Sequence, residues 1–271
     1  TATTQRSRFR ISRFTISDYH GKKRWLSVPE ILIHSSNIGS AKMALDVGTD
    51  TQRRYLKRFG LLEQSPIKLL EVGTPLYPAR WREINTMTIS YGHGIAVSPI
   101  QLASGIAAMI NGGMLYPPRI VKRVPAEKLK GTQVIARETS DTMRMLIRKV
   151  VTEGTGKNAE VEGFYVGGKT GTADKPGRRG KRRVISSFVS AFPMTDPKYL
   201  VLVLVDEPKA SKKTHGYLTG GWIAAPVVRN VIEGMVPIVG LTPDRSLAGA
   251  GLDKKLIFMT ARNAQQLHRG Q

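Results

Sequence analysis

A short segment in the second half of the chain combines a cation, two hydroxyls and very little side-chain bulk. Residues 167–173 read GGKTGTA, so Lys169, Thr170, Gly171 and Thr172 follow one another directly. The lysine supplies positive potential, the hydroxyls can hydrogen-bond to a carboxylate, and backbone N–H groups beside small residues can stabilise an oxyanion. The segment is therefore predicted to hold an anion. The simpler interpretation is a glycine-marked bulge in a strand with a solvated lysine.

A second polar cluster lies far upstream, where Ser35 and Asn37 offer a hydroxyl and an amide two residues apart. Alone this triplet is weak evidence, because Ser and Asn commonly cap and end helices. A serine nucleophile activated by a lysine three residues later would complete a set of groups for acyl transfer. The four serines before Ser35 have no such lysine, since the residues three positions after them are Arg10, Thr15, His20 and Glu30. We therefore expect the attacking nucleophile to lie outside this chain.

Residues 163–170 also match the phosphate-binding loop pattern G-x-x-x-x-G-K-[ST]. That pattern binds nucleotides only where it follows a buried strand and opens a helix. Polar residues 157–162 precede it, and Gly171, Pro176 and Gly177 follow, so a helix cannot continue. A nucleotide-binding protein that uses Gly163 to Thr170 is the less favoured alternative.

The elements that must position these groups are predicted to be helices in the first part of the chain. Ser27 and Glu30 form a capping box, so a helix should begin there and end near Ser35 and Asn37. Further helices are expected at about 38–45, 50–60, 98–110 and 140–153. The proline-containing residues 63–82 are predicted to form a long surface loop.

The second part of the chain is predicted to contain strands at 164–173, 184–192 and 199–205, paired as three adjacent antiparallel strands. On a strand, Lys169 and Gly171 would face one side, and Thr170 and Thr172 the other. A helix at 222–235 carries an apolar stripe suited to covering one sheet face.

The predicted fold class is thus α/β of the α+β type, an antiparallel sheet covered by helices with a large helical subdomain. The helical part spans about 26–155, the sheet and last helix span about 160–236, and 237–271 form a C-terminal tail.

The net charge of +22 predicts attraction to polyanions such as nucleic acid, anionic lipid or anionic cell-wall polymer. Its densest cluster, residues 175–183, has no aromatic residues for base stacking and no helical periodicity, so nucleic-acid binding is not expected. We interpret it as a mobile basic loop, either simply solvated or docked on an anionic partner.

The chain has no cysteine, which excludes disulfides, thiolate metal sites and a cysteine nucleophile. Its five histidines show no ligand spacing, so neither a metal nor an organic cofactor is predicted. No apolar run approaches the about 18 residues of a membrane span, and we expect any membrane anchor to lie outside this chain.

Several segments together resemble the transpeptidase domain of penicillin-binding proteins. Residues 34–44 (HSSNIGSAKMA) resemble its second motif region, and residues 92–102 (GHGIAVSPIQL) resemble the segment that leads into a core helix. The Lys-Thr-Gly segment follows in the same order. The resemblance runs from about Phe14 to Pro237 and implies a penicillin-binding protein/serine β-lactamase-like fold. It is greatest to the class B, division-specific peptidoglycan D,D-transpeptidases, because elongation enzymes tend to have an aspartate where Asn37 stands.

The resemblance implies a role for each site residue. Ser35 would relay a proton between the nucleophile and the leaving group, and Asn37 would hold the substrate amide. Lys169 would polarise Ser35. The substrate-binding residues would be Thr170, Gly171 and Thr172, whose two hydroxyls would bind the carboxylate of the acceptor or of a β-lactam. Residues 217, 220 and 221 lie where the family closes the cleft.

The resemblance also implies a serine acyl-enzyme that cross-links D-Ala-D-Ala stem peptides in septal wall synthesis, with the family's Ser-x-x-Lys and a membrane anchor upstream. The implied partners are stem peptides, β-lactams, cell-division membrane proteins and a glycan-strand polymerase, but no nucleic acid. The implied location is the periplasmic face of the bacterial inner membrane. The chain alone would be inactive, and a non-catalytic penicillin-binding or scaffold role remains a further alternative.

Overall fold

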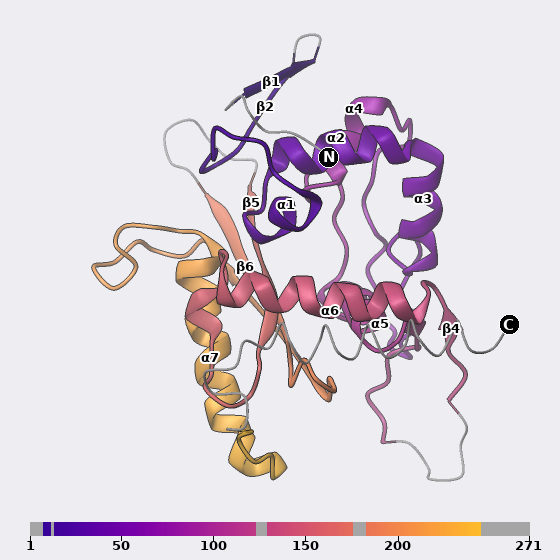
Figure 1. The fold of residues 1–271 in the computed structure, drawn as a ribbon. Helices are drawn as coiled ribbons and strands as arrows, with labels where there is room; N and C mark the ends of the chain where they lie inside the picture. The colour runs from indigo at the N-terminus through magenta and orange to yellow at the C-terminus, as the bar shows by residue number, and fades with distance from the viewer. Residues whose placement is uncertain (1–7, 12–13, 123–128, 176–182, 245–271) are drawn as a thin grey trace, which may run out of the picture. The chain divides into compact units, whose positions relative to one another are not determined.

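The computed structural model describes residues 8–11, 14–122, 129–175 and 183–244. These residues form two compact units, whose helices and strands are drawn in Figure 1 and labelled where there is room. The first unit runs to Ala108 and includes Met114–Val134, and the second consists of Met109–Gly113 and the chain from Ile135 onward. Residues 135–155, which the sequence analysis grouped with the helical part, thus belong to the same unit as the sheet.

The first unit is mainly helical. Its elements in chain order are β1 (Arg8–Ile11), β2 (Phe14–Ser17), α1 (Val28–Ile33), α2 (Asn37–Val47), α3 (Thr49–Arg58), α4 (Glu83–Ile89), α5 (Pro99–Ile110), β3 (Met114–Leu115) and β4 (Thr132–Gln133). The strands β1 and β2 form an antiparallel hairpin. A buried cluster of Ile16 from β2, Ile38 and Ala41 from α2, and Met87 from α4 joins the hairpin to the helices. This packing fixes the start of α2 against the end of β2.

The predicted helix starts in this unit are confirmed. At α1, the backbone N–H of Ser27 donates to Glu30 Oε2 at 2.8 Å, as a capping box requires. At α5, the backbone N–H of Ser98 likewise donates to Gln101 Oε1 at 3.1 Å. The helix α4 was not predicted, because it is short and mostly polar, with Met87 as its fully buried apolar residue.

The second unit is built on an antiparallel sheet in the order β5-β6-β7, as predicted. Its strands are β5 (Gly167–Asp174), β6 (Val184–Phe192) and β7 (Tyr199–Asp206), and its helices are α6 (Arg137–Thr152), the short 3-10 helix η1 (Lys157–Ala159) and α7 (Gly220–Val239). The register places Thr170 opposite Phe188 and Lys169 opposite Val189.

The two long helices cover opposite faces of this sheet. Phe188 and Phe192 of β6 pack with Val228 and Ile232 of α7 in a fully buried cluster. Ala191 points the other way, because side chains alternate along a strand, and it packs with Ile147 of α6. The predicted α+β architecture, with an antiparallel sheet covered by helices, is confirmed.

The helix α7 is longer than predicted at both ends. It begins at Gly220 instead of residue 222 and continues through Pro237 to Val239, where Gly240 ends it in a left-handed conformation with φ of 69°. By length and composition it could cross a membrane. One side of α7, with Val228 and Ile232, is buried in the core of this unit, whereas Val227, Val231 and Ile238 are exposed. Residues 245–271 of the predicted tail and 176–182 of the predicted basic loop lie outside the described residues.

Candidate active site

The turn between α1 and α2 holds Ser35 in an unusual conformation. Its φ is 54°, in the left-handed region that residues other than glycine seldom adopt. Such strain persists only where the surroundings impose it, and it is concentrated at functional sites. Ser35 is exposed, whereas the next residue, Ser36, is buried. The turn therefore presents the Ser35 side chain at the surface of the first unit while Ser36 anchors it.

The anchor is Asp18, which follows β2 directly. Its Oδ2 accepts a hydrogen bond from Ser36 Oγ at 2.9 Å, and its Oδ1 accepts one from the backbone N–H of Ile38 at 3.0 Å. Ser36 Oγ in turn accepts from the backbone N–H of Gly39 at 3.0 Å and so caps α2. Sequence reasoning missed Asp18, because its partners lie 18 and 20 residues away and no local pattern marks it.

Asn37 is fixed by the same segment. Its Nδ2 donates to the backbone carbonyl of Ser17 at 3.0 Å. An amide nitrogen carries two protons, so this contact leaves Asn37 able to donate a second hydrogen bond to a ligand. The role predicted for Asn37 is compatible with this geometry.

A Ser-x-x-Lys spacing does occur at Ser65 and Lys68, which the sequence analysis did not consider. Ser65 is buried and lies in an irregular segment, where its Oγ accepts from the backbone N–H of Ile67 at 3.4 Å. A serine and a lysine three positions apart share a face when they lie on a helix, and this segment is not helical. The pair is therefore not a nucleophile and its base.

In the second unit, Lys169 lies half-buried on β5. Its Nζ donates to the carbonyl of Thr170 at 3.0 Å and lies 3.5 Å from Thr170 Oγ1. Burial lowers the pKa of Lys169 from 10.5 to about 8, because the ammonium loses hydration. Lys169 is thus still a cation at neutral pH, but one held near its titration point.

The two threonines of β5 point toward the start of α7. Thr172 Oγ1 accepts a hydrogen bond from the backbone N–H of Gly220 at 3.1 Å. Thr170 Oγ1 lies 2.8 Å from the hydroxyl of Thr155, which follows α6. The predicted alternation is confirmed, since Gly171 instead faces Ser187 on the other side of the sheet. Sequence reasoning missed Thr155, which stands 15 residues before Thr170.

The glycines around Lys169 are required by the sheet itself. A Cβ on Gly171 would collide with Ser187 Oγ, and a Cβ on Gly168 would lie 2.6 Å from the carbonyl oxygen of Val189. From the sequence, these glycines were expected to leave the neighbouring backbone N–H groups accessible to an oxyanion. The structure shows that they are also needed for the close packing of β5 against β6.

Arg148 of α6 holds the beginning of β5. Its Nη1 donates to the carbonyl of Val166 at 2.6 Å and pairs with the carboxylate of Glu160. The Arg148 side chain is almost fully buried, so removing Glu160 would leave its charge without compensation. This contact fixes the residue that precedes β5, and so helps to fix the positions of Lys169 and Thr170 on that strand.

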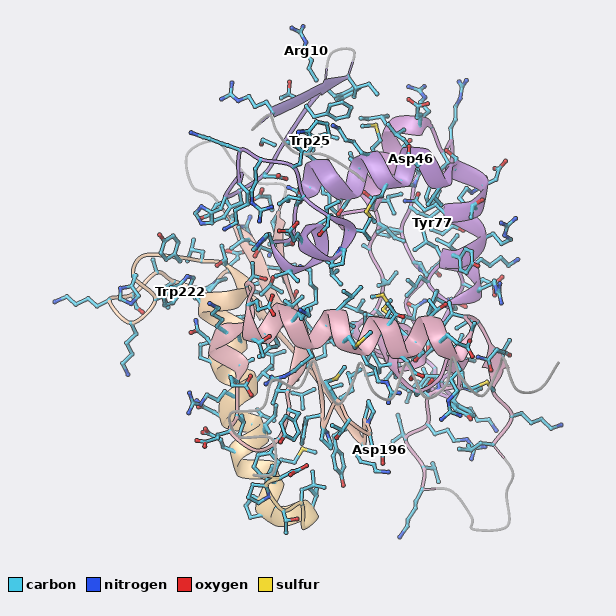
Figure 2. All side chains as sticks on the ribbon, viewed as in Figure 1. Arg10, Trp25, Asp46, Tyr77, Asp196 and Trp222 are labelled. Carbon is cyan, nitrogen blue, oxygen red and sulfur yellow. The ribbon has the colours of Figure 1, made fainter. Side chains whose placement is uncertain are left out.

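The loop before α7 carries an aromatic stack. The ring of Tyr217 lies parallel to that of Trp222, with centroids 5.6 Å apart, and His215 meets Trp222 edge-on at 5.0 Å. Trp222 is in the first turn of α7 (Figure 2). Tyr217, Gly220 and Gly221, to which the resemblance gave a cleft-closing position, thus lie at the end of α7 that contacts β5.

The phosphate-loop alternative is wrong. Residues 167–174 form a strand, and β5 continues past Thr170 where the pattern would require a helix to begin. Among the described residues, no group of three or more histidines or carboxylates is placed to hold a metal ion.

Ser35 and Asn37 belong to the first unit, and Lys169, Thr170, Gly171 and Thr172 to the second. The model of the penicillin binding protein transpeptidase domain matches residues 2–233 and so includes both sets. The chain belongs to this family. The match extends over most of the chain and covers both predicted motif regions.

Relatives with curated names agree with this membership. The chain is 38% identical to a probable peptidoglycan D,D-transpeptidase FtsI of Caulobacter vibrioides, covering 87% of this chain and 42% of the relative. It is 36% identical to the stage V sporulation protein D of Bacillus subtilis, covering 84% of this chain and 36% of the relative. The chain therefore spans less than half the length of these relatives.

A solved structure agrees as well. The transpeptidase domain of penicillin-binding protein 3 from Burkholderia pseudomallei superposes with a TM-score of 0.80 at 32% identity, covering 89% of this chain and 73% of that chain. The fold expected from the sequence is thus the fold of this family.

Proposed function

We propose that this chain is part of a serine-type peptidoglycan D,D-transpeptidase that cross-links stem peptides. The observation that carries the proposal is the arrangement on β5, where a lysine with a pKa lowered to about 8 adjoins two threonines that face the start of α7. A cation beside hydroxyl donors suits a carboxylate and the oxyanion that develops in acyl transfer.

In the proposed reaction, a serine hydroxyl attacks the carbonyl between the two terminal D-Ala residues of a stem peptide. The serine loses its proton, the terminal D-Ala leaves as an amine that gains one, and an ester to the enzyme remains. An amine of a second stem then attacks the ester and releases the serine. The attacking serine would come from sequence that precedes Thr1.

Each site residue has a proposed task in these steps. Ser35 relays the proton to the leaving amine, and Asn37 holds the substrate amide with its second N–H. Lys169 polarises Ser35 and adds positive potential. Thr170 and Thr172 bind the carboxylate of the substrate or of a β-lactam.

We further propose that the enzyme works in septal wall synthesis at the periplasmic face of the inner membrane, with cell-division membrane proteins and a glycan-strand polymerase as partners. The similarity to a protein named FtsI supports a division-type enzyme, whereas another relative is a sporulation protein. Depletion in the source organism distinguishes these roles. Filaments without septa would support division, and normal septa with defective spores would overturn it.

Intact-protein mass spectrometry tests the reaction class. The full-length protein, incubated with penicillin, should gain one acyl adduct on a serine upstream of Thr1, and the chain Thr1–Gln271 should gain none. An adduct mapped to Ser35 or Ser65 would mean that the nucleophile is wrongly assigned. A full-length protein without any adduct would favour the non-catalytic scaffold alternative.

A further inference from the structure

The turn that follows α6 contacts both β5 and α7. Thr155 presents its hydroxyl to Thr170 Oγ1 at 2.8 Å. The backbone carbonyl of Thr155 lies against Gly221, where a Cβ would come within 2.5 Å of it. Asn158 Nδ2 donates to the carbonyl of Gly221 at 2.8 Å. The turn therefore joins the strand that carries the substrate-binding threonines to the first turn of α7.

This turn is held in place by contacts on its core side. The backbone N–H of Gly156 donates to the carbonyl of Val150 at 2.9 Å, and the N–H of Ala159 donates to the carbonyl of Gly156 at 2.9 Å. Gly156 packs on the ring of Phe188, and a Cβ there would lie 3.1 Å from that ring. Thr155 is exposed, yet its hydroxyl is fixed in position because its backbone is anchored in the core.

The direction of the hydrogen bond between the two threonines decides what Thr170 can do. Either hydroxyl can be the donor. Lys169 Nζ, 3.5 Å from Thr170 Oγ1, can only donate. If Thr170 donates to Thr155, its proton is engaged within the protein. If Thr155 donates to Thr170, the proton of Thr170 is available to an acceptor from outside.

We propose that Thr155 is a positioning residue that donates to Thr170 and thereby aims the Thr170 proton at the substrate carboxylate. The inference rests on the proposed function, because it assumes that Thr170 binds that carboxylate. A carboxylate accepts only, so Thr170 must donate to it, and Thr155 must then donate to Thr170. The ligand, Thr170 and Thr155 form a chain in which every proton points toward the carboxylate.

Three variants of the full-length protein test this role. Thr155→Val has nearly the same shape without a hydroxyl, and Thr155→Ser restores the donor. Thr152→Val is the matched control, because the hydroxyl of Thr152 bonds only weakly to the carbonyl of Arg148 in its own helix, at 3.5 Å. Thr155→Ala provides a second loss-of-donor variant in case valine disturbs the turn.

The measurement separates the dissociation constant of the first penicillin complex from the acylation rate constant. Thr155→Val and Thr155→Ala should weaken penicillin binding by about five- to tenfold, the net effect of losing one hydrogen bond between neutral groups. They should leave the acylation rate constant nearly unchanged. Penicillin methyl ester, which lacks the anionic carboxylate, should bind the variants and the wild type equally. Thr155→Ser and Thr152→Val should behave as the wild type does.

A double-mutant cycle with Thr170→Val separates this inference from the proposed function. Thr155→Val should have no further effect once Thr170 has lost its hydroxyl. If Thr170→Val alone binds penicillin as the wild type does, the proposed carboxylate role of Thr170 fails. If Thr170→Val weakens binding but Thr155→Val does not, or if the two effects add in full, only the positioning role of Thr155 is overturned. Equal weakening of the methyl ester would also overturn it.

Discussion

The carboxylate of Asp18 accepts a hydrogen bond from the hydroxyl of Ser36 at 2.9 Å and so ties the end of β2 to the beginning of α2. The same carboxylate accepts from the backbone N–H of Ile38, one of the donors that an isolated helix start leaves unsatisfied. The negative charge of Asp18 also interacts favourably with the positive end of the helix dipole at the N-terminus of α2. Asp18 therefore fixes the turn in which Ser35 and Asn37 stand, although it was not among the predicted site residues.

Replacing Asp18 by alanine should destabilise the protein by about 1–3 kcal/mol, because the buried Ser36 hydroxyl and the Ile38 N–H both lose their acceptor. Chemical denaturation of the variant and the wild type measures this difference. Ser17→Ala is the matched control, since Asn37 bonds to the backbone carbonyl of Ser17 and that carbonyl remains. An equal loss in both variants would show that the end of β2, and not the carboxylate, supports the turn.

Lys169 should make acylation depend on pH. Its pKa is lowered to about 8 by burial, so the cation predominates below that pH and is lost as the pH rises through it. If the cation stabilises the oxyanion, the rate of acylation by penicillin should fall as the pH rises through about 8. Lys169→Arg should keep its charge and move this fall to higher pH. Lys169→Ala should reduce acylation by about a hundredfold or more at neutral pH.

The opposite pH profile would assign Lys169 a different task. A rate that rises through pH 8 would mean that the neutral amine accepts a proton from Ser35 or from the nucleophile. An unchanged rate in Lys169→Ala would remove the residue from the mechanism.

Glu30 should contribute stability that is lost in acid. Hydrogen bonds from Arg24 and then from Ser27 lower the pKa of Glu30 from 4.5 to about 2. A carboxyl group with a lowered pKa in the folded state stabilises that state above its unfolded pKa and loses this effect as the pH falls through the folded pKa. The difference in melting temperature between the wild type and Glu30→Gln should thus be constant above about pH 4.5 and should shrink as the pH falls from 4.5 to about 2.

Glu63→Gln is the control for this measurement, because the ion pair of Glu63 with Lys57 is open to solvent on both sides. Its melting temperature should follow the wild type throughout this range. A constant difference for Glu30→Gln down to pH 2 would mean that Arg24 and Ser27 do not stabilise the carboxylate.

The sequence was sufficient to predict those elements that depend on contacts between residues close together in the chain. The capping residues Ser27 and Ser98 mark helix starts within four residues, and the alternation along β5 already separates Lys169 from Thr170. The start of α4 is stabilised by an equally local contact, in which the backbone N–H of Arg82 donates to Asn85. Arginine is not a usual capping residue, so no sequence pattern predicted this helix start. The C-terminal tail was predicted to begin at Pro237, yet α7 continues for two residues beyond it.

What could not be predicted depends on contacts between distant segments. Asp18 and Thr155 act on the two motifs through hydrogen bonds that span 18 and 15 residues. Neither residue has an unusual neighbourhood in the sequence. The requirement for Gly171 likewise becomes visible only when β6 places Ser187 opposite it. The motif residues were found because chemistry restricts their types, whereas the residues that hold them are restricted only by geometry.

The basic segment 175–183 is anchored at both ends by acidic residues. Lys175 Nζ lies 2.8 Å from Asp206 Oδ1 and 2.7 Å from Glu207 Oε1, and Arg183 pairs with Glu207 as well. Arg183, and then Lys175, lower the pKa of Glu207 to about 2, so this carboxylate stays charged at neutral pH. Two of the segment's positive charges are thus matched by carboxylates at the end of β7, and Arg178, Arg179, Lys181 and Arg182 provide the excess.

Replacing these four residues by glutamine should reduce co-sedimentation of the full-length protein with anionic cell-wall polymer at low salt, if the segment docks on such a polymer. The difference from the wild type should vanish at high salt, because ions screen the attraction. The matched control replaces four basic residues of α3, Arg53, Arg54, Lys57 and Arg58, by glutamine and removes the same formal charge elsewhere. Equal losses in both variants would mean that only net charge matters, and no loss in either would leave the segment as a solvated hairpin connection.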